Sequence, residues 1–328
     1  MPDRQRCLYC EGELGEVMFS GVRDRLGVSD KTWTFRRCKS CGSAVLDPMP
    51  TLDELLAAYP PNYHVDEIPQ TQWLHRLQYG LEMRLFYEPI WRYSVKAVQR
   101  VTGLRGGKLL DVGGGSGHRS ALFQQAGFEV TVLDPDERAL QIAQARFGLR
   151  TVCGLLEETD LPENGFDLVT FWFVIEHLPN PKQTLAAAHR VLRPGGWLVA
   201  LVPLADSWQA KVFRERWTEV REAPRHVGLP TQKGMKCLLE RSGLQPMAWV
   251  SGSLLCSAGI VALSLVPAAA TPIACGHQSF AVRFLWRLLG ISATLAGLPF
   301  AWLEKMAEHP RAGIFFATKP ENQKGQRA

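Results

Sequence analysis

Short apolar runs alternate with longer amphipathic segments between residues 106 and 250. The segments between the runs carry apolar residues at helical spacing, while each run has the length of a strand. Such alternation is typical of βαβ units, in which helices cover both faces of a parallel sheet. We therefore expect an α/β fold with a doubly wound sheet here. The expected strands are Lys108–Val112, Phe128–Leu133, Phe166–Phe171, Trp197–Val202 and Leu244–Val250.

The pattern changes on both sides of this segment. Residues 70–102 carry apolar side chains at helical spacing, which Pro89 interrupts, and residues 1–50 contain glycine-rich turns and a strand-like run at Thr32–Arg37. Downstream, an apolar stretch precedes a last strand candidate at Gly313–Thr318 and a polar tail. The expected units are a small module at 1–50, a helical linker or lid at 51–105, the α/β core at 106–250, an apolar helical insertion at 251–308, and the last strand and tail at 309–328.

Composition narrows the class of protein. The chain has 328 residues, 46% apolar and 21% charged, as in globular proteins of about two domains. A formal net charge of +5 permits contact with nucleic acid or an anionic membrane but requires neither. The first residues contain no apolar leader segment, so a cytoplasmic protein is expected.

A glycine-rich loop follows the first expected core strand. It reads Asp111-Val112-Gly113-Gly114-Gly115-Ser116-Gly117 and precedes an expected helix at 118–126. Glycines at this point allow a tight turn and a close approach of the backbone to a ligand. The dinucleotide pattern G-x-G-x-x-G would place a glycine where His118 stands, and the lysine of a P-loop is absent. The next strand ends in Asp134, whose carboxylate can accept the two hydroxyls of a ribose.

With these residues the sequence resembles the class I S-adenosylmethionine-dependent methyltransferases. Further matching motifs are Phe166-Asp167-Leu168-Val169, Glu176-His177-Leu178-Pro179-Asn180-Pro181 and Arg190-Val191-Leu192-Arg193-Pro194-Gly195-Gly196. The resemblance implies a seven-stranded, mostly parallel sheet of the Rossmann-like methyltransferase fold, with the last strand antiparallel. It also implies S-adenosyl-L-methionine as the cofactor.

The resemblance assigns cofactor contacts to particular residues. The three alternate glycines Gly113, Gly115 and Gly117 would cradle the methionine part, Asp111 would orient its amino group, and Asp134 would hold the ribose. Gly154 and Leu155, at the end of the third strand, would lie beside the adenine without the acid that the family often has there. Phe171 and Trp172 would lie beside the cofactor, where an aromatic face attracts a sulfonium.

Four of the eight cysteines form two C-x2-C pairs, Cys7/Cys10 and Cys38/Cys41. Four thiolates on two tight turns make a closed tetrahedral zinc site, so we expect a structural zinc ribbon. Catalytic zinc would need an open position, and a redox pair would need a single C-x-x-C at a strand–helix turn. The ribbon followed by the core resembles the zinc-containing methyltransferases of sugar-nucleotide and natural-product pathways.

Two histidines are candidates for removing a proton from the acceptor. His177 follows the fourth core strand, and His226 lies in the loop after the fifth, so both are expected at the sheet edge where ligands bind. His226 is the stronger candidate for the catalytic base, with Glu222 near enough to orient its ring. Deoxysugar C-methyltransferases have a Glu-His pair here, whereas Arg225 precedes His226 in this chain. The alternatives are a helix-start role for His177 and a packing role for His226.

The insertion between the last two strands is unusually apolar. No Asp, Glu, Lys or Arg occurs between Arg241 and Arg283, and Leu254–Cys275 is apolar enough to span a membrane. The flanking strands must nevertheless join one sheet, so we expect residues 252–308 to lie in a membrane interface or to form an apolar lid. Buried helices that pack on the core or across a dimer are the alternative.

The leading hypothesis for function is methyl transfer to an oxygen or carbon of a small molecule. The acceptor classes are a sugar nucleotide, a lipid-linked glycan, and an isoprenoid or polyketide. The Asn/Asp-Pro-Pro-Tyr signature of many N-methyltransferases is absent after the fourth strand. An RNA methyltransferase that reads its substrate with the ribbon and a non-catalytic zinc scaffold are the competing hypotheses. No nucleic-acid partner is expected, because few basic residues surround the cysteines. The oligomeric state, monomer or dimer, is left open.

Overall fold

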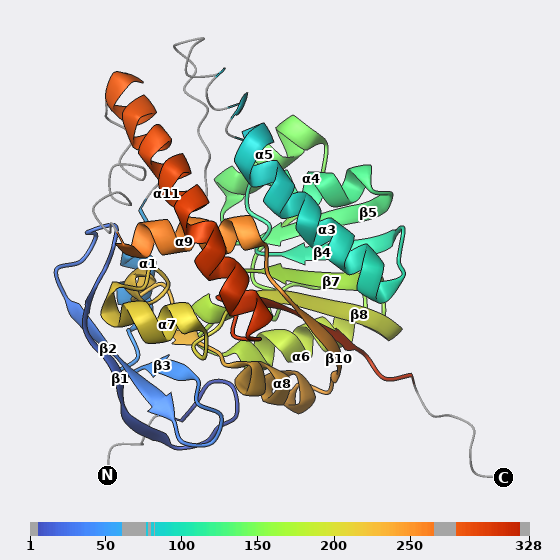
Figure 1. Ribbon diagram of the computed structural model, residues 1–328. Helices are drawn as coiled ribbons and strands as arrows, with labels where there is room; N and C mark the ends of the chain where they lie inside the picture. Colours follow the sequence, from blue (N-terminus) through green and yellow to red (C-terminus); the bar gives the residue numbers. More distant parts are fainter. Residues whose placement is uncertain (1–5, 61–76, 78–79, 82, 266–279, 322–328) are drawn as a thin grey trace.

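A seven-stranded sheet forms the centre of the molecule in the computed structural model (Figure 1). The structure describes residues 6–60, 77, 80, 81, 83–265 and 280–321, and only the backbone of 280–287. The strand order is β10-β11-β8-β7-β4-β5-β6, and all neighbours are parallel except β11, which runs antiparallel to β10 and β8. The expected doubly wound α/β fold with an antiparallel last strand is therefore confirmed. The strands are β4 (Gly107–Val112), β5 (Phe128–Asp134), β6 (Arg150–Cys153), β7 (Phe166–Trp172), β8 (Leu192–Pro203), β10 (Gln245–Ser251) and β11 (Ala312–Thr318).

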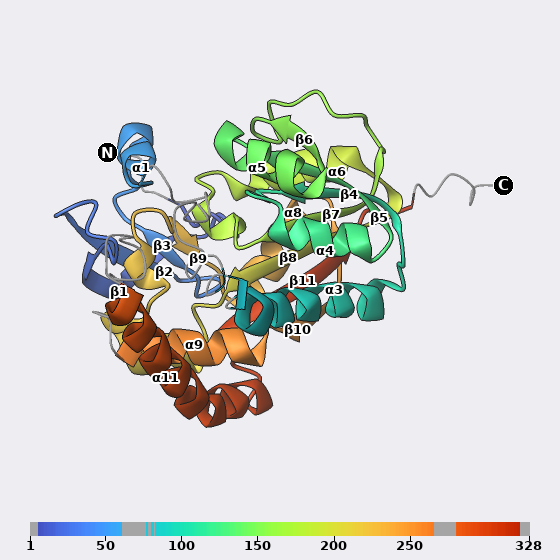
Figure 2. The same cartoon turned by 90° about the horizontal axis from the view of Figure 1, so that it is seen from above.

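Helices cover both faces of this sheet and close two apolar cores (Figure 2). On one face lie α3 (Glu88–Thr102), α4 (His118–Gln125) and α5 (Glu137–Phe147), and on the other α6 (Pro181–Val191) and α8 (Gln232–Arg241). Local sequence explains their ends. Asp136 caps the start of α5 through Arg138 N, and Gly148 ends it in the left-handed conformation. The expected strands and the helix after the glycine loop thus lie where the sequence places them, within a few residues.

A second, antiparallel sheet of four strands lies at the N-terminal end of the chain. It has the order β1-β2-β3-β9, from β1 (Leu14–Arg23), β2 (Thr32–Cys38), β3 (Ala44–Leu46) and β9 (Gly228–Leu229). The last of these belongs to the segment that follows β8, so the N-terminal sheet is completed by a strand from the core. A third apolar core lies beneath it and includes Phe35 and Trp217.

Loops at the carboxyl ends of β7 and β8 meet the N-terminal sheet at one edge of the core. Leu46 N donates to Val227 O, and Val227 N donates to Glu176 O, at 3.0 and 2.9 Å. Short helices complete this edge: α1 (Leu52–Ala57), η2 (Ile175–His177), α7 (Trp208–Phe213), η3 (Arg214–Arg216) and η4 (Val220–Glu222).

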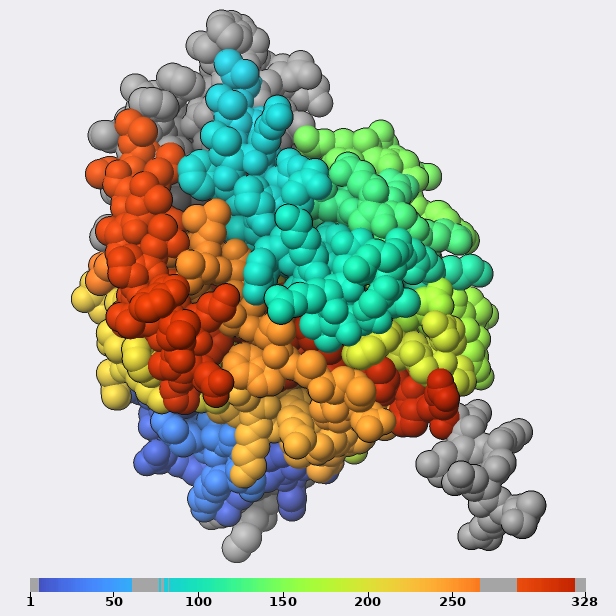
Figure 3. All heavy atoms as spheres, turned by 45° about the vertical axis from the view of Figure 1, so that its right-hand side comes forward, coloured from blue at the N-terminus to red at the C-terminus, as the bar shows by residue number. Residues whose placement is uncertain are grey.

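The described part of the apolar insertion between β10 and β11 is helical, as expected. It contains α9 (Leu254–Leu265) and α11 (Phe280–Met306), which pack against each other, and α9 also packs on α7. In the space-filling view α11 lies on the outside of the molecule (Figure 3). Within the described ranges, no helix combines the length and the apolar character needed to cross a membrane.

Three expectations fall partly outside the described residues. The structure shows a π-helical turn, η1 (Met83–Tyr87), directly before α3, but the start of the expected 70–102 helix lies outside. The same holds for the second half of the apolar stretch 254–275 and for the end of the polar tail.

Candidate active site

The glycine loop turns sharply between β4 and α4. Gly113, Gly115 and Gly117 have φ values of 68°, 52° and 77°, which side chains disfavour. A Cβ atom on Gly113 would lie 2.6 Å from the side chain of Val174, at the start of η2. The loop therefore packs directly against the segment that carries Glu176 and His177, and it forms a cradle that only glycine permits.

Two aspartates hold this loop in place. Asp134 accepts a hydrogen bond from Gly115 N through Oδ2 at 2.9 Å, and Gly154 N donates to its carbonyl oxygen. Asp111 is buried beneath the loop, and its carboxylate accepts from Ser120 Oγ and Thr170 Oγ1 at 2.5 and 2.7 Å. Burial raises the pKa of Asp111, and these two hydrogen bonds oppose the shift. The structure thus brings both expected acids to the loop.

The structure places the two expected aromatic residues inside the core, and their contact with the cofactor stays a prediction. Phe171 and Trp172 are both buried side chains of the apolar cores, one on each face of the sheet. Trp172 packs on Phe123, and the Arg119 guanidinium lies 4.9 Å above its ring. The two side chains enter different cores because alternate residues of a strand point to opposite faces of the sheet. Leu155, in contrast, is 40% exposed beside Gly154.

The two candidate histidines meet at the edge of the core. The ring centroids of His177 and His226 lie 4.6 Å apart, nearly perpendicular to each other. Tyr59, which follows α1, places its hydroxyl 3.0 Å from His177 Nδ1. His226 is 4% exposed, whereas His177 is only half-buried. Solvent therefore reaches the histidine pair from the side of His177. Burial lowers the pKa of His226, and the nearby Glu219 and Glu222 oppose that shift.

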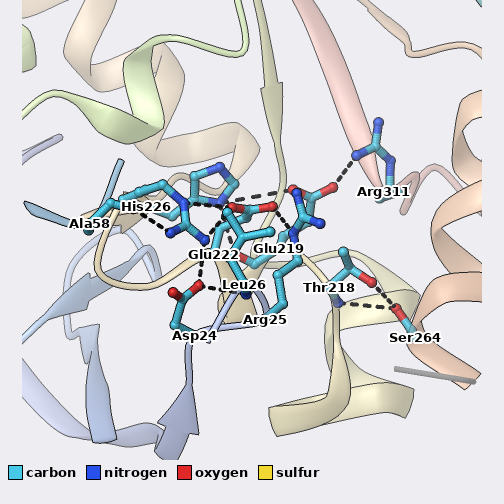
Figure 4. A network of polar contacts seen from close by, with 11 residues as sticks. Asp24, Arg25, Leu26, Ala58, Thr218, Glu219, Glu222, His226, Ser264 and Arg311 are labelled. Carbon is cyan, nitrogen blue, oxygen red and sulfur yellow. Dashed lines mark hydrogen bonds and ion pairs between the residues drawn. The ribbon is translucent and has the colours of Figure 1, made fainter. Parts of the chain in front are cut away.

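The residue that orients His226 differs from the one expected. His226 Nδ1 lies 2.8 Å from the carbonyl oxygen of Glu219, and the Glu219 carboxylate lies 4.0 Å from the same nitrogen. Glu222 instead pairs with Arg25 and Arg225, and Glu219 pairs with Arg311 (Figure 4). A carbonyl oxygen can only accept, so Nδ1 of His226 carries the proton.

Arg225 joins three parts of the chain in this network. Its side chain is fully buried and contacts Asp24 after β1 at 2.5 Å, Glu222 at 2.9 Å and the carbonyl oxygen of Ala58 at 2.8 Å. Asp24 also accepts from Leu26 N and Val28 N. The residue that departs from the deoxysugar pattern thus clamps the loop of His226 to the N-terminal sheet.

Glu176 is a site residue that the motif contained but sequence reasoning did not select. It is fully buried, and neither carboxylate oxygen has a hydrogen-bond partner among the described residues. Burial raises its pKa well above the usual range, and the nearby carboxylate of Glu219 raises it further. One oxygen of Glu176 and one nitrogen each of His177 and His226 lie within 4.8 Å of one another. No sequence signal distinguishes Glu219 or Asp24, because their roles depend on contacts between distant segments.

The four N-terminal cysteines form a compact cluster. The Sγ atoms of Cys7 and Cys41 are 3.6 Å apart, those of Cys10 and Cys38 are 3.4 Å apart, and all four lie within 4.8 Å of one another. Sulfur atoms that share one tetrahedral zinc ion at about 2.3 Å are separated by about 3.8 Å. All four are free thiols. The cluster therefore fits a four-coordinate zinc ion.

Comparison with known proteins agrees with this geometry. A family model described as a methyltransferase domain matches residues 81–248, just over half of the chain. The chain therefore belongs to this family of class I S-adenosylmethionine-dependent methyltransferases, as its motifs predict.

Curated relatives match the core of the chain. The ubiquinone/menaquinone biosynthesis C-methyltransferase UbiE of Methylobacterium nodulans is 36% identical over 120 residues, which cover 34% of this chain and 48% of the relative. A ubiquinone biosynthesis O-methyltransferase of Bordetella avium is 35% identical over 109 residues, which cover 31% of this chain and 45% of the relative. The chain thus spans about half the length of these relatives.

The matched solved structures are less similar to this chain in sequence than these curated relatives. The 1,6-didemethyltoxoflavin-N1-methyltransferase of Burkholderia thailandensis has 17% identity and a TM-score of 0.48, covering 86% of this chain and 97% of that one.

Proposed function

We propose that this protein transfers the methyl group of S-adenosylmethionine to an oxygen or carbon of a small molecule. The observation that supports the proposal is the packing of Val174 on Gly113, because Val174 lies three residues before His177, whose ring contacts His226. Methyl transfer is an in-line displacement, so the protein must mainly hold the acceptor beside the sulfonium. The matched relatives include both a C- and an O-methyltransferase, in agreement with either acceptor atom.

For the cofactor, we assign the methionine part to the glycine loop, as the family resemblance implies. The carboxylate of Asp134 lies beside the loop and is suited to the ribose hydroxyls, while Asp111 supports the loop from beneath. Gly154 and the exposed side chain of Leu155 would border the adenine. When bound, the cofactor supplies an activated methyl group.

We further propose that His226 and His177 assist the loss of a proton from the acceptor. The Nδ1 proton of His226 is directed to Glu219, so Nε2 carries the lone pair of the neutral ring. His226 is the stronger candidate for a general base, and Glu219 rather than Glu222 orients its ring. His177, on the more exposed side, would contact the acceptor first.

The cysteine cluster is proposed to hold structural zinc. Four protein ligands leave no open position for a substrate, and the site belongs to the sheet that β9 joins. The zinc would therefore stabilise the sheet to which the His226 loop is attached.

The insertion is proposed to rest on an anionic membrane surface. Helices α11 and α3 both lie on the side of the molecule seen in Figure 3. The described part of α11 exposes apolar side chains, and α3 exposes basic ones. Apolar side chains flanked by cations suit a bilayer with anionic headgroups. Such a position favours an isoprenoid or polyketide acceptor. The exposed apolar residues are Leu288, Leu289, Leu295, Trp302, Leu303 and Met306, and the basic ones are Arg92, Lys96 and Arg100.

Two measurements test the activity. Calorimetry is expected to show binding of S-adenosylmethionine and S-adenosylhomocysteine, and no binding of NADH. Methyl label from S-adenosylmethionine is expected to reach a phenolic isoprenoid acceptor rather than RNA or an amine. Absence of cofactor binding in folded protein contradicts the proposal, and label found in RNA supports the competing hypothesis instead.

A further inference from the structure

A fully buried glutamate faces two histidines at the candidate active site. Glu176 comes from η2, as does His177, whereas His226 comes from the loop after β8. Their nearest ligand atoms all lie within 4.8 Å of one another, and the two imidazole rings are in direct contact. Because the three residues come from two separate loops, their convergence is a property of the tertiary structure.

The other charged groups nearby are already paired. Glu219 binds Arg311, and Glu222 binds Arg25 and Arg225. Glu176 lacks a hydrogen-bond partner for both oxygens within the described part of the chain, which is costly for a group with no contact with water. A cation between Glu176 and the two rings would remove this cost.

We infer that Glu176, His177 and His226 bind a divalent first-row transition cation, at a site separate from the cysteine cluster. One carboxylate and two imidazoles are a ligand set used for Fe²⁺, Mn²⁺ and catalytic Zn²⁺. Ligand atoms about 2.1 Å from such an ion are separated by about 3–4 Å. The three ligand atoms here lie within 4.8 Å of one another, so small side-chain movements bring them to these separations. Three protein ligands leave open positions for an acceptor.

The surroundings of both rings resemble the outer shell of a metal site. Histidine ligands usually bond through their second nitrogen to a carbonyl, carboxylate or hydroxyl group, which fixes the ring. His226 Nδ1 lies 2.8 Å from the carbonyl oxygen of Glu219, and His177 Nδ1 lies 3.0 Å from the hydroxyl of Tyr59. This leaves the lone pair of His226 on Nε2, the nitrogen that a cation would use.

The cation changes how the proposed reaction proceeds. This step rests on the proposed function: the imidazoles hold the ion, and the ion lowers the pKa of a hydroxyl bound to it. An oxygen acceptor, a phenol or an adjacent diol, is then the substrate class. Its proton leaves to solvent, and the resulting oxyanion attacks the methyl group while the sulfonium sulfur takes up the electron pair of the broken bond.

Titration of the purified holoprotein with Mn²⁺ tests the inference. Binding is measured by the loss of the free-ion signal in electron paramagnetic resonance. Mn²⁺ prefers oxygen and nitrogen to thiolate, so the cysteine cluster does not compete. The wild-type chain is expected to bind about one Mn²⁺, and Glu176→Gln about tenfold more weakly or worse. His177→Ala, at a half-buried position, gives a second variant if Glu176→Gln does not fold. His189→Ala, a half-buried histidine of α6 away from the site, is the matched control.

The result is independent of the proposed methyl transfer. Cofactor affinity is measured by calorimetry in the same preparations, so Mn²⁺ binding without cofactor binding rejects the proposed function and leaves the metal site standing. Unchanged Mn²⁺ affinity in both variants, or no Mn²⁺ binding by wild-type protein, overturns the inference. In that case His226 as general base remains the proposal for the acceptor proton.

Discussion

At the scale of single residues, one side chain supports the glycine loop and has a proposed second role in binding the cofactor. Asp134 holds Gly115 N and, as we propose, the ribose of the cofactor. Sequence position alone indicates the second role, because an acid at the end of this strand is typical of the fold. The first role requires the loop to return over the strand end, which only the structure shows.

Replacement of Asp134 is expected to weaken cofactor binding. Asp134→Ala removes a charged hydrogen-bond acceptor, so the affinity for S-adenosylmethionine should fall by about 1.5–3 kcal/mol, measured by calorimetry. Asp160→Ala, an exposed acid after the neighbouring strand, is the control and should bind normally. Equal affinities for the two variants would remove Asp134 from the ribose site.

Glu304 is expected to make stability depend on pH. It is fully buried in α11, and burial raises its pKa from 4.5 to about 7, although hydrogen bonds from Gln209 and the charge of Arg311 oppose the shift. The native state therefore binds this proton more tightly than the unfolded state. This proton contributes up to about 3 kcal/mol to the free energy of unfolding. The contribution is fully present below about pH 4.5 and is lost as the pH rises through about 7.

The variant Glu304→Gln tests this assignment by urea unfolding between pH 5 and 8. Its amide can donate to Gln209 Oε1, which has no partner among the described residues. The free energy of unfolding should fall with rising pH less steeply than in the wild type. Parallel pH profiles for the two proteins would show that Glu304 titrates normally.

At the scale of elements, the loop 218–226 connects the separate layers of the molecule. Arg225 forms an ion pair with Asp24. Thr218 bonds Ser264 of α9, and Glu219 binds Arg311 before β11 (Figure 4). The sequence predicted His226 in this loop but not the clamp around it. Buried ion pairs form between residues about 200 positions apart here, and no local pattern encodes such a pair.

Breaking this clamp is expected to destabilise the protein strongly. Asp24→Ala leaves Arg225 buried with fewer acceptors, so the free energy of unfolding should fall by about 3–5 kcal/mol. Asp53→Ala, an exposed acid in the first turn of α1, should change it by less than about 0.5 kcal/mol. Urea unfolding measures both, and a loss below about 1 kcal/mol for Asp24→Ala would show that the clamp contributes little.

At the scale of the whole molecule, the cysteine cluster and the core form one structure. Strand β9 pairs with β3, and Thr231 Oγ1 donates to the carbonyl oxygen of Cys41 at 2.6 Å. The N-terminal sheet thus depends on the core for its last strand, and the His226 loop depends on the sheet.

Loss of zinc is therefore expected to affect both parts. Purified protein should contain about one zinc per chain in the cysteine cluster, and Cys38→Ser should lose it. Hydrogen exchange should then increase in β1–β3 and also in β9. Exposed Cys153→Ser is the control and should keep the metal. Folded wild-type protein without metal in this cluster, or with an iron–sulfur chromophore, would contradict the prediction.

Membrane contact is expected to depend on the exposed face of α11. The protein should float with liposomes that contain anionic lipid, and high salt should weaken the association. The double variant Leu295→Glu, Trp302→Glu should remain in the soluble fraction. Leu52→Glu with Leu56→Glu, on the equally exposed face of α1, should still float. If wild-type protein does not float, α11 serves another contact, such as a second copy of the chain.

The sequence by itself determined the architecture and the family. Strand and helix periods are local, and the glycine loop, Asp134 and the C-x2-C pairs are contiguous motifs, so each can be identified without the fold. Only the tertiary structure decided which side chains meet. It buried Phe171 and Trp172 in the apolar cores, brought the carbonyl oxygen of Glu219 to His226 Nδ1, and brought Glu176 close to two histidines. Those outcomes depend on side-chain direction and burial at the junction of distant segments, and neither is written in the local order of residues.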